Sequence, residues 1–506
     1  MSHLIAIITK IKKGMKLRLS KSLYTRGLQC QKSLWLKKHK KEVLTPPNSS
    51  AQAIFENGNV VGDLACKLFP NGVEIPFENT TFQDKITLTQ DYINQGYENI
   101  YEATFEFDGI LIMIDILNIK DNRVILNEVK SSTDIKDVYL HDASIQYYVL
   151  NGLGYDVKQV NVIHINNNYI RGEELDINQL FCIVNITNEV LELQSNIKNN
   201  IEIFRKTLSK DIEPTIDIGT HCSSPYSCDA VDYCWNHIPK YSIFDISRLN
   251  SKKKFELYQN GILEFSQIEN IDSFSISQQV QIISEKENRT IINKEAIKEF
   301  LESLTYPIYH LDFETFQQAV PEFVGLSPYQ QIPFQYSLHI EHEDGILEHK
   351  EFLSQDGIDP REQIAKRLVE DIPTNVTVLA YNMGFEKGVI RKLASLFPNL
   401  SSNLMAIHDN CHDLMTPFQN KDYYHPNMKG SYSIKYVLPS LVPEFENAYK
   451  ELDLIHNGGE AMEAFANLSK IDDVDLKQRY RDSLLEYCKL DTLAMVKVLE
   501  KLRESV

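Results

Sequence analysis

Three cysteines of the chain lie close together. Cys222, Cys228 and Cys234 follow one another in a C-x5-C-x5-C pattern. Thiolates grouped in this way bind zinc or an iron–sulfur cluster. Three thiolates leave a four-coordinate site one ligand short, so a fourth ligand has to come from another part of the chain.

Acids and a lysine form a second group that is capable of chemistry. Asp115 interrupts an apolar run, where a carboxylate is costly unless it is paired or binds a metal. Glu128 and Lys130 are two residues apart and so share one face of a strand. Such a set can hold Mg²⁺ and leave an ammonium to act on the attacking water. Glu102 is a candidate further ligand, and Gln146 is a candidate to position a phosphate or the lysine. The alternative is a hairpin with surface charges, because a D…E-x-K match is common by chance.

A third group lies in the C-terminal part of the chain. Asp312 and Glu314 share one strand face, and Tyr487 and Asp491 are four residues apart on one face of a helix. Asp491 lies on the apolar stripe of that helix, where solubility does not explain a carboxylate. The pattern predicts a carboxylate cluster for two metal ions, with the tyrosine orienting the attacking water. The alternative is a coincidence of acids in an acidic chain.

Periodicity predicts the elements that position these residues. Residues 101–131 alternate and contain the turn Lys120-Asp-Asn, which predicts three strands joined by tight turns. Residues 15–45 predict a basic, helix-rich entry, and 240–300 a small helical connector. The other predicted helices are 51–69, 134–151, 186–209, 360–370, 384–397 and 474–503. The other predicted strands are 157–165, 307–313, 333–341, 348–353 and 376–381.

Composition sets limits on the class of protein. The 506 residues are 43% apolar and 24% charged, as in ordinary globular proteins. No apolar run is long enough to span a membrane, and the start lacks a signal-peptide pattern, so we expect a cytoplasmic protein without a membrane partner. The net charge of −18 argues against a general nucleic-acid coat protein. Residues 1–60 carry twelve Lys or Arg and two acids, a net of +10, so the remainder carries −28. The basic start could meet a phosphate backbone or could form a merely solvated helix, and the acidic excess suits divalent metals.

Asp115, Glu128-x-Lys130 and Gln146 resemble the active site of the PD-(D/E)xK nucleases, specifically the RecB-like branch. Iron–sulfur members of that branch, including CRISPR-associated exonucleases, have one cysteine before the nuclease core and three after it. The resemblance covers about residues 15–238 and implies a 4Fe–4S cluster that ties the two ends of the domain together. Its implied ligands are Cys30, Cys222, Cys228 and Cys234. The five-residue spacings and the remote fourth ligand favour a cluster over zinc, although zinc stays open.

Two positions depart from that branch. Gly62 stands where the branch usually has a metal-binding histidine, and Leu150 stands where an aromatic residue often follows the glutamine. The missing ligand puts metal affinity at this site in question. The other four cysteines are isolated in apolar or helical contexts, and we expect them to be buried free thiols; they are Cys66, Cys182, Cys411 and Cys488.

The C-terminal group resembles the tyrosine-bearing form of the DnaQ-like, or DEDD, 3′–5′ exonucleases, which have a ribonuclease-H-like fold. The resemblance covers about residues 305–506 and implies that Asp312, Glu314, Tyr487 and Asp491 form the active site. Within Ala380-Tyr-Asn-Met-Gly-Phe-Glu386, Glu386 replaces the aspartate of the family, and Asp413 is a lesser candidate. The stretch after Gly430 also resembles an uncharacterised bacterial domain found fused to such nucleases. Its Lys435 and tyrosines could contact the backbone or bases of a strand, or could equally be core and cap residues.

Together these observations predict an α/β protein in four parts. They are an extension (1–14), a restriction-endonuclease-like mixed sheet with a 4Fe–4S clasp (15–238), a helical connector (239–304) and a ribonuclease-H-like domain (305–506). The predicted function is hydrolysis of phosphodiester bonds with Mg²⁺ or Mn²⁺, on ends or single strands of DNA, in repair, recombination or defence. The alternatives are an RNA exonuclease, a binding protein whose nuclease sites have decayed, and a redox sensor that uses the cluster.

Overall fold

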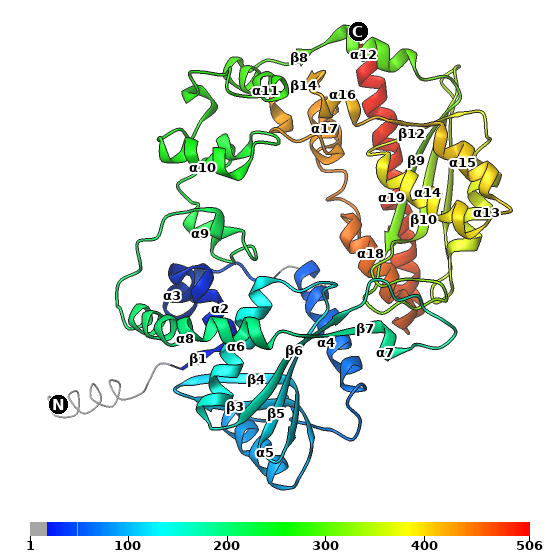
Figure 1. The fold of residues 1–506 in the computed structure, drawn as a ribbon. Coiled ribbons are helices and arrows are strands. Elements are labelled where there is room, and N and C mark those ends of the chain that lie inside the picture. The colour runs from blue at the N-terminus through cyan, green and yellow to red at the C-terminus, as the bar shows by residue number, and fades with distance from the viewer. Residues whose placement is uncertain (1–17, 48) are drawn as a thin grey trace. The chain divides into compact units, whose positions relative to one another are not determined.

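The computed structural model describes residues 18–47 and 49–506, so the predicted extension (1–14) lies outside the described residues. By its internal contacts the chain divides into two compact units (Figure 1). The first unit contains the described residues up to His237 and the separate segment 318–329. The second unit contains Ile238–Gln317 and Gln330–Val506. Both units combine a mixed sheet with helices, so the α/β class is confirmed.

The first unit is built on a seven-stranded sheet with the order β2-β3-β4-β5-β6-β7, in which β1 pairs with β4. Its strands are β1 (Leu19–Ser20), β2 (Val73–Glu74), β3 (Asn99–Phe107), β4 (Ile110–Lys120), β5 (Arg123–Lys130), β6 (Asp156–Ile165) and β7 (Phe181–Asn185). β3, β4 and β5 are antiparallel, and β6 runs parallel to β5. Asp108–Gly109 and Asp121–Asn122 have positive φ angles, which two-residue hairpin turns of this kind require. The three strands predicted within 101–131 are therefore confirmed.

The alternation of β4 breaks around Asp115. Ile114 and Leu117 pack into the same large core, whereas Ile116 packs into a second cluster. In a regular strand, side chains three residues apart point to opposite faces. The alternation is therefore interrupted between Ile114 and Leu117. On the paired strand β3, Glu102 has a φ of 57°, in the left-handed region. This local irregularity changes the direction of the side chains around Asp115 on β4 and Glu102 on β3.

Helices cover both faces of this sheet. They are α2 (Lys21–Gln29), α3 (Gln31–His39), α4 (Ser49–Cys66), α5 (Phe82–Asn94), α6 (Asp137–Gly152), α7 (Ile177–Leu180), α8 (Thr187–Leu208) and α9 (Val231–Cys234). α2, α3, α6 and α8 contribute to the large core with Val162 of β6, and α4 and α7 pack with Ile163 on the opposite face. α2 lies so close to α8 that a Cβ at Gly27 would meet the Phe204 ring at 2.9 Å.

The residues around α9 fasten to α2, although they lie far apart in the sequence. Arg26 donates to both carboxylate oxygens of Asp229, at 2.7 and 2.8 Å. Gln29 donates to the carbonyl oxygens of His221 and Tyr226, each at 2.8 Å. These contacts close the first unit by joining its first helix to its last segment before His237.

The second unit is built on a five-stranded sheet with the order β11-β10-β9-β12-β13. Its strands are β9 (Ile308–Phe316), β10 (Ile332–Glu341), β11 (Leu347–Leu353), β12 (Thr377–Ala380) and β13 (Cys411–Asp413). β9, β10 and β11 are antiparallel, whereas β12 and β13 run parallel to β9. The strands predicted at 307–313, 333–341, 348–353 and 376–381 are confirmed within a few residues, and β13 was not predicted.

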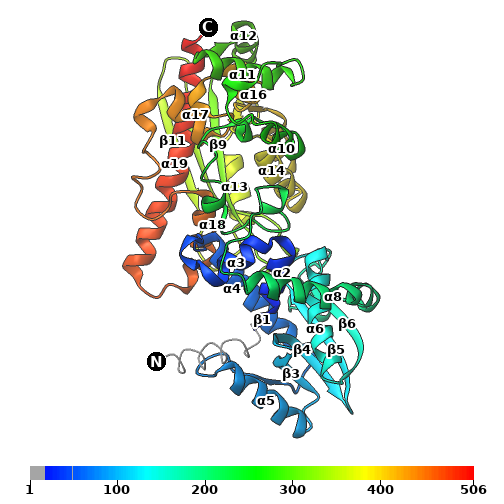
Figure 2. The same ribbon diagram turned by 90° about the vertical axis from the view of Figure 1, so that its left-hand side faces the viewer.

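The two faces of this sheet differ in character. Its helices are α13 (Arg361–Asp371), α14 (Gly384–Leu396), α15 (Ser401–Asp409), α16 (Thr416–Gln419), α17 (Ile434–Leu441), α18 (Gly458–Asn467) and α19 (Val474–Glu504). Tyr309, Leu311 and Phe313 of β9 pack with α13, α14 and α15. Because side chains alternate along a strand, Asp312 and Glu314 lie on the other face, along which α19 runs (Figure 2).

Residues 238–304 belong to the second unit. They contain α10 (Ser251–Gln259), α11 (Ile276–Glu287), α12 (Lys294–Glu302) and the short strand β8 (Ile291–Ile292), which pairs with β14 (Tyr423–Tyr424). The segment predicted as a helical connector is therefore mostly helical but also supplies a strand. Across the described part of the chain, no helix combines the length and apolar character that crossing a bilayer requires.

Replacing Arg26 by Ala tests the fastening of the first unit. The two hydrogen bonds to Asp229 are partly buried, and hydrogen bonds to charged groups are worth about 1–3 kcal/mol. We expect the free energy of unfolding of the first unit to fall by that amount, as measured by denaturant titration. The matched control is Arg18→Ala, which breaks the more exposed pair with Glu106 and should change stability by less than about 0.5 kcal/mol. Equal effects of the two substitutions would contradict the assignment.

Candidate functional site

Three predicted residues of the first unit meet at a single carboxylate. Glu128 on β5 is 1% exposed. Its Oε1 accepts from the Nζ atoms of Lys21 and Lys130, each at 2.7 Å. Its Oε2 accepts from Nε2 of Gln146 on α6 at 2.6 Å. The structure therefore brings Glu128, Lys130 and Gln146 together, and Gln146 retains a buried Oε1 without a hydrogen-bond partner.

Two further members of this network were missed from the sequence. Lys130 donates to Oδ2 of Asp142 at 2.9 Å, and Lys21 lies 3.7 Å from the same oxygen. Burial acts to raise the pKa of Glu128, but the two ammonium groups outweigh it and hold that pKa below its ordinary value. The pKa of each lysine is raised, because the neighbouring acids outweigh the effect of burial. Asp142 lies four residues before Gln146 on α6. This spacing could have predicted that the two side chains share one face of the helix.

The remaining acids of the first unit lie beside this network. Oδ2 of Asp115 accepts from the backbone N–H of Val129 at 2.7 Å. Burial, together with the charge of Glu128, raises the pKa of Asp115 to about 7. Burial also raises the pKa of Glu102.

A metal ion at this first site would meet competition. Among the described residues, one set of three acids, cysteines or histidines has ligand atoms that all lie within 4.8 Å of one another, and it belongs to the second unit. Glu102, Asp115 and Glu128 do not form such a set. A cation would have to compete with Lys21 and Lys130 for Glu128, so the arrangement here is charge-paired and does not fit a metal as it stands.

The two departures from the nuclease pattern have different surroundings. A Cβ at Gly62 on α4 would meet no atom within 4 Å, so packing does not require glycine there. Leu150 on α6 is fully buried in the large core. At the position where the RecB-like branch often has an aromatic residue, this core accommodates a leucine.

The four predicted cluster ligands line one cavity of the first unit. Cys30, Cys222, Cys228 and Cys234 are all among its lining residues. Cys30 lies at the junction of α2 and α3, and Ser33 one turn later contacts the Cys228 sulfur at 3.4 Å. Burial raises the pKa values of the Cys30 and Cys234 thiols, and the neighbouring thiols raise them further. Positive charge in the cavity would favour the thiolates.

The spacing of these thiols bears on what the cavity fits. Zinc–sulfur bonds of about 2.3 Å in a tetrahedron place sulfurs about 3.8 Å apart. No three of these four sulfurs lie within 4.8 Å of one another among the described residues. The four thiols therefore line one cavity without being gathered within zinc-ligand distances of one another.

The other cysteines match their predicted environment in part. Cys411 and Cys488 are buried, whereas Cys66 and Cys182 are only partly buried. The expectation of full burial is therefore wrong for the latter two. Cys488 lies on α19 with its sulfur 3.8 Å from Oδ2 of Asp312, beside the second group of acids.

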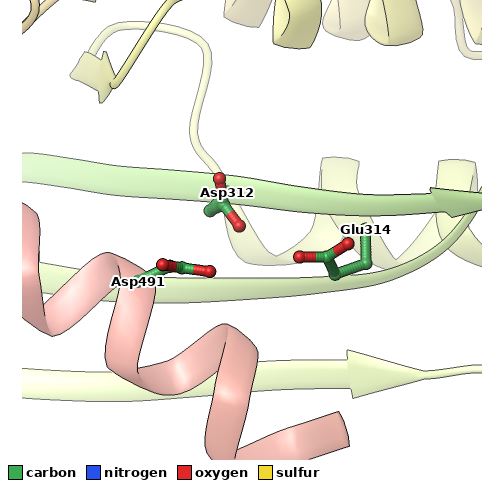
Figure 3. Close-up of side chains that lie close together, drawn as sticks. All are labelled: Asp312, Glu314 and Asp491. Atoms are coloured by element: carbon green, nitrogen blue, oxygen red, sulfur yellow. The ribbon is translucent and has the colours of Figure 1, made fainter. Parts of the chain in front are cut away.

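Asp312, Glu314 and Asp491 form that second group. Figure 3 shows the two β9 acids and Asp491 of α19 converging from the strand and the helix. One carboxylate oxygen of each lies within 4.8 Å of the others. Tyr487 lies one turn before Asp491, is 4% exposed and is hydrogen-bonded to it. The structure thus brings together four residues that were predicted from motifs 170 residues apart or more.

Burial of these like charges perturbs their ionisation. Burial and the charge of Asp491 raise the pKa values of Asp312 and Glu314 well above their ordinary range. Burial raises the pKa of Asp491 to about 6. Lys435 on α17 partly offsets the rise at Glu314 and at Asp491. A divalent cation among these oxygens would remove the conflict, and carboxylates are the ligands that Mg²⁺ and Mn²⁺ prefer, so the set fits such an ion.

Glu386 and Asp413 occupy different roles. Glu386 in the first turn of α14 is 2% exposed, and its Oε2 has no hydrogen-bond partner. Burial, with a contribution from Asp413, raises the pKa of Glu386 to about 8. Oδ1 of Asp413 accepts from the backbone N–H groups of Asn382 and Met415, at 2.9 and 3.0 Å. Asp413 therefore holds the turn between β12 and α14, and Glu386 is the acid left with a free oxygen.

Tyr449 and the start of α18 were not recognised from the sequence. The Tyr449 hydroxyl donates to Oδ1 of Asp491 at 2.6 Å. A Cβ at Gly458 would lie 3.6 Å from Oε2 of Glu314 and 3.9 Å from the Tyr487 hydroxyl. Tyr449 lies in an irregular stretch after α17, where periodicity carries no signal, and Gly458 begins a helix that was not predicted from the sequence.

Parts of the chain are similar to known protein sequences. Residues 309–433 match a domain of unknown function (DUF2779), which covers β9 to the residues just before α17. The chain is also 24% identical over 234 residues to the uncharacterized protein UU173 of Ureaplasma parvum serovar 3. That similarity covers 42% of this chain and 33% of the relative, so the chain spans about a third of the relative's length.

Proposed function

We propose that the chain is a divalent-metal-dependent nuclease and that Asp312, Glu314 and Asp491 are its principal reaction site. The observation that carries the proposal is the approach of these three carboxylates within 4.8 Å from a strand and a helix distant in sequence. Buried like charges destabilise a fold unless a cation joins them. We assign this unit a DnaQ-like exonuclease activity on a ribonuclease-H-like fold.

The residues around this site have separable roles. A bound Mg²⁺ or Mn²⁺ would supply Lewis-acid stabilisation of the charge that develops on the phosphate. Tyr449 donates to Oδ1 of Asp491 and so holds this carboxylate in the cluster with Asp312 and Glu314. Tyr487, hydrogen-bonded to Asp491, is placed to orient the attacking water. Glu386 offers its free carboxylate oxygen to the same reaction.

For the first unit we propose a RecB-like PD-(D/E)xK site on a restriction-endonuclease-like fold. Lys130 is its central group, because Glu128 and Asp142 hold its ammonium at 2.7 and 2.9 Å. The raised pKa keeps this ammonium charged, so that it can attract and orient a phosphate. A divalent cation would first have to displace Lys21 and Lys130 from Glu128, and for that reason we propose this as the secondary site of hydrolysis.

We also propose that the cysteine cavity holds a 4Fe–4S cluster. The support is that four thiols from both ends of the unit line one cavity and are not gathered within zinc-ligand distances of one another. Such a cluster would tie α2 and α3 to α9, so its role is structural. Redox sensing has no separate support.

The proposed substrate is nucleic acid with exposed ends or single strands, DNA in preference to RNA. Support comes from the basic residues of α2, α3 and the turn after α3, which belong to the same unit as Lys130. They are Lys21, Arg26, Lys32, Lys37, Lys38, Lys40 and Lys41, of which Lys21, Arg26, Lys32 and Lys37 also pair with acids of this unit. Such a cluster favours a phosphate backbone.

Separate substitutions distinguish the two sites. We expect Asp312→Asn to lower metal-dependent degradation of end-labelled strands by about 100-fold or more, since one ligand of the cation is lost. Lys130→Ala should remove the remaining cleavage, and the double variant should be inactive. Glu348→Gln and Lys120→Ala are the matched controls, because both side chains are more than half exposed and pair with residues outside the proposed sites, Glu348 with His342 and Lys120 with Glu98.

Matched DNA and RNA strands in the same assay decide the substrate. Degradation of RNA alone would make the chain an RNA exonuclease. Activity that survives the double substitution would refute both site assignments. Wild-type protein that binds strands without degrading them would instead indicate a binding protein.

The pH dependence of stability tests the carboxylate cluster. The four raised pKa values (Asp312, Glu314, Glu386 and Asp491) mean that the folded state binds more protons than the unfolded state, whose carboxyl pKa values are about 4. Stability of the second unit in chelator should therefore fall as pH rises from about 4 towards 8. Added Mn²⁺ should stabilise the unit more at pH 8 than at pH 6, as measured by calorimetry.

Asp312→Asn provides the internal check on that experiment. It removes one buried like charge, so in chelator at pH 8 the unfolding midpoint should rise by about 2–4 °C. The response to Mn²⁺ should disappear in the same variant, whereas Glu348→Gln should keep it. A midpoint that falls on substitution would show that the buried acids are not in electrostatic conflict.

Replacing Cys228 by Ser tests the cluster. We expect loss of one thiolate to lower the iron content and to destabilise the first unit by about 2 kcal/mol or more, because metal binding contributes to folding. Iron and zinc analysis of anaerobically purified protein and calorimetry check this. Cys182→Ser is the control, since Cys182 on β7 does not line the cavity. Zinc without iron in the wild type would refute the cluster.

A further inference from the structure

Segment 318–329 belongs to the first unit, although β9 precedes it and β10 follows it in the chain. The backbone N–H of Tyr329 donates to the carbonyl oxygen of Gln318 at 2.8 Å, so the two ends of the segment are joined. The segment is therefore a closed loop and not an extended linker. Its buried residues, which are Ala319, Pro321, Leu326 and Pro328, give it an apolar side.

Backbone hydrogen bonds hold the loop to residue 171 of the first unit. The N–H of Gly325 donates to the carbonyl oxygen of Arg171 at 2.7 Å, and the N–H of Arg171 donates to that of Leu326 at 2.9 Å. The Arg171 guanidinium also donates to the carbonyl oxygen of Pro321, at 3.4 Å. Ala319, with Val320 and Tyr329 against it, packs in the second cluster of the unit; the other members include Ile163, Ile165 and Val129.

Tyr329 connects this loop to the proposed lysine site. Its hydroxyl donates to the carbonyl oxygen of Ser131, the residue directly after Lys130 at the end of β5. Burial raises the pKa of Tyr329, so its hydroxyl stays protonated and keeps its hydrogen to donate to Ser131. The ring of Tyr139 lies 5.1 Å from the Lys130 ammonium. Tyr329 thus contacts the backbone directly after Lys130, and Tyr139 contacts the ammonium of the same lysine.

The backbone of Tyr329 supports a specific role for this contact. Its φ of 57° lies in the left-handed region, which is unfavourable for a residue with a side chain. Such a conformation persists where the surroundings over-determine it, and it often marks a functional position. Here two hydrogen bonds hold the conformation of Tyr329: its N–H donates to the carbonyl oxygen of Gln318, and its hydroxyl donates to that of Ser131.

We propose that the loop 318–329 is an integral part of the first reaction site and that Tyr329 is a positioning residue for Lys130. By holding the carbonyl of Ser131, it fixes the end of β5, and with it the direction in which Lys130 approaches Glu128 and Asp142. The inference rests on the proposed nuclease function of the first unit. It also means that the first site is incomplete until the chain has been made beyond residue 329.

The test uses the full chain with Asp312→Asn, so that the first site is measured alone. Tyr329→Phe removes the hydroxyl bond and keeps the ring in the cluster. We expect kcat to fall about 10-fold with KM within about twofold, because a small displacement of a catalytic group lowers turnover more than binding. The matched control is Tyr169→Phe, which removes a hydroxyl of the same cluster that accepts from the N–H of Asp176.

Hydrogen exchange provides a readout that does not depend on activity. The N–H of Ile165 donates to the carbonyl oxygen of Ser132 at 3.0 Å and so reports on the turn after Lys130. Its exchange should accelerate in Tyr329→Phe and more strongly in Leu326→Ala, which weakens the packing of the loop. Exchange in β3 and β4 should stay unchanged in Tyr329→Phe.

The outcomes separate this inference from the proposed function. Unchanged kcat and unchanged exchange in Tyr329→Phe, or equal effects of Tyr169→Phe, would overturn the positioning role. If Lys130→Ala leaves cleavage intact in the same background, or if that background cleaves nothing, the proposed function of the first unit fails. In that case the exchange measurement still decides whether the loop fixes the end of β5.

Discussion

A carboxylate that loses its hydration on folding needs positive charge beside it, and the sites of both units reflect that requirement. In the first unit the chain supplies the charge itself, because Lys21 and Lys130 both reach Glu128. In the second unit Asp312, Glu314 and Asp491 face one another, with Lys435 as a partial counter-charge. The opposite shifts in pKa follow directly: the pKa of Glu128 is lowered, whereas those of the three facing acids are raised.

This difference gives the two sites different chemical capacities. A carboxylate already paired with two ammonium groups is a poor ligand for a further cation, but it holds those ammonium groups in place for a phosphate. Carboxylates in mutual repulsion are poised to bind a divalent cation, and binding would release the protons that their raised pKa values retain. The proposed division between a principal and a secondary site of hydrolysis follows from this electrostatic contrast.

Connections between distant parts of the sequence also shape the first unit. The bidentate pair of Arg26 and Asp229 and the cavity lined by Cys30 and three later cysteines join the beginning of the unit to its end. The loop 318–329 adds a third piece of chain through Tyr329 and Ser131. Closing long loops is costly in conformational entropy, so several independent contacts at the same place are what such a join requires.

The sequence by itself determined the α/β class, the strands of both sheets that alternate strongly, and the placement of Asp312, Glu314, Tyr487 and Asp491 on shared faces. These follow from periods of two and of 3.6 residues, which are local properties of the chain. Only the tertiary structure decided that Lys21 and Asp142 share the first site, that Tyr449 holds Asp491, and that 318–329 belongs with the first unit. Those partners are set by packing between distant segments, and no local pattern encodes which of many lysines, acids or tyrosines will meet.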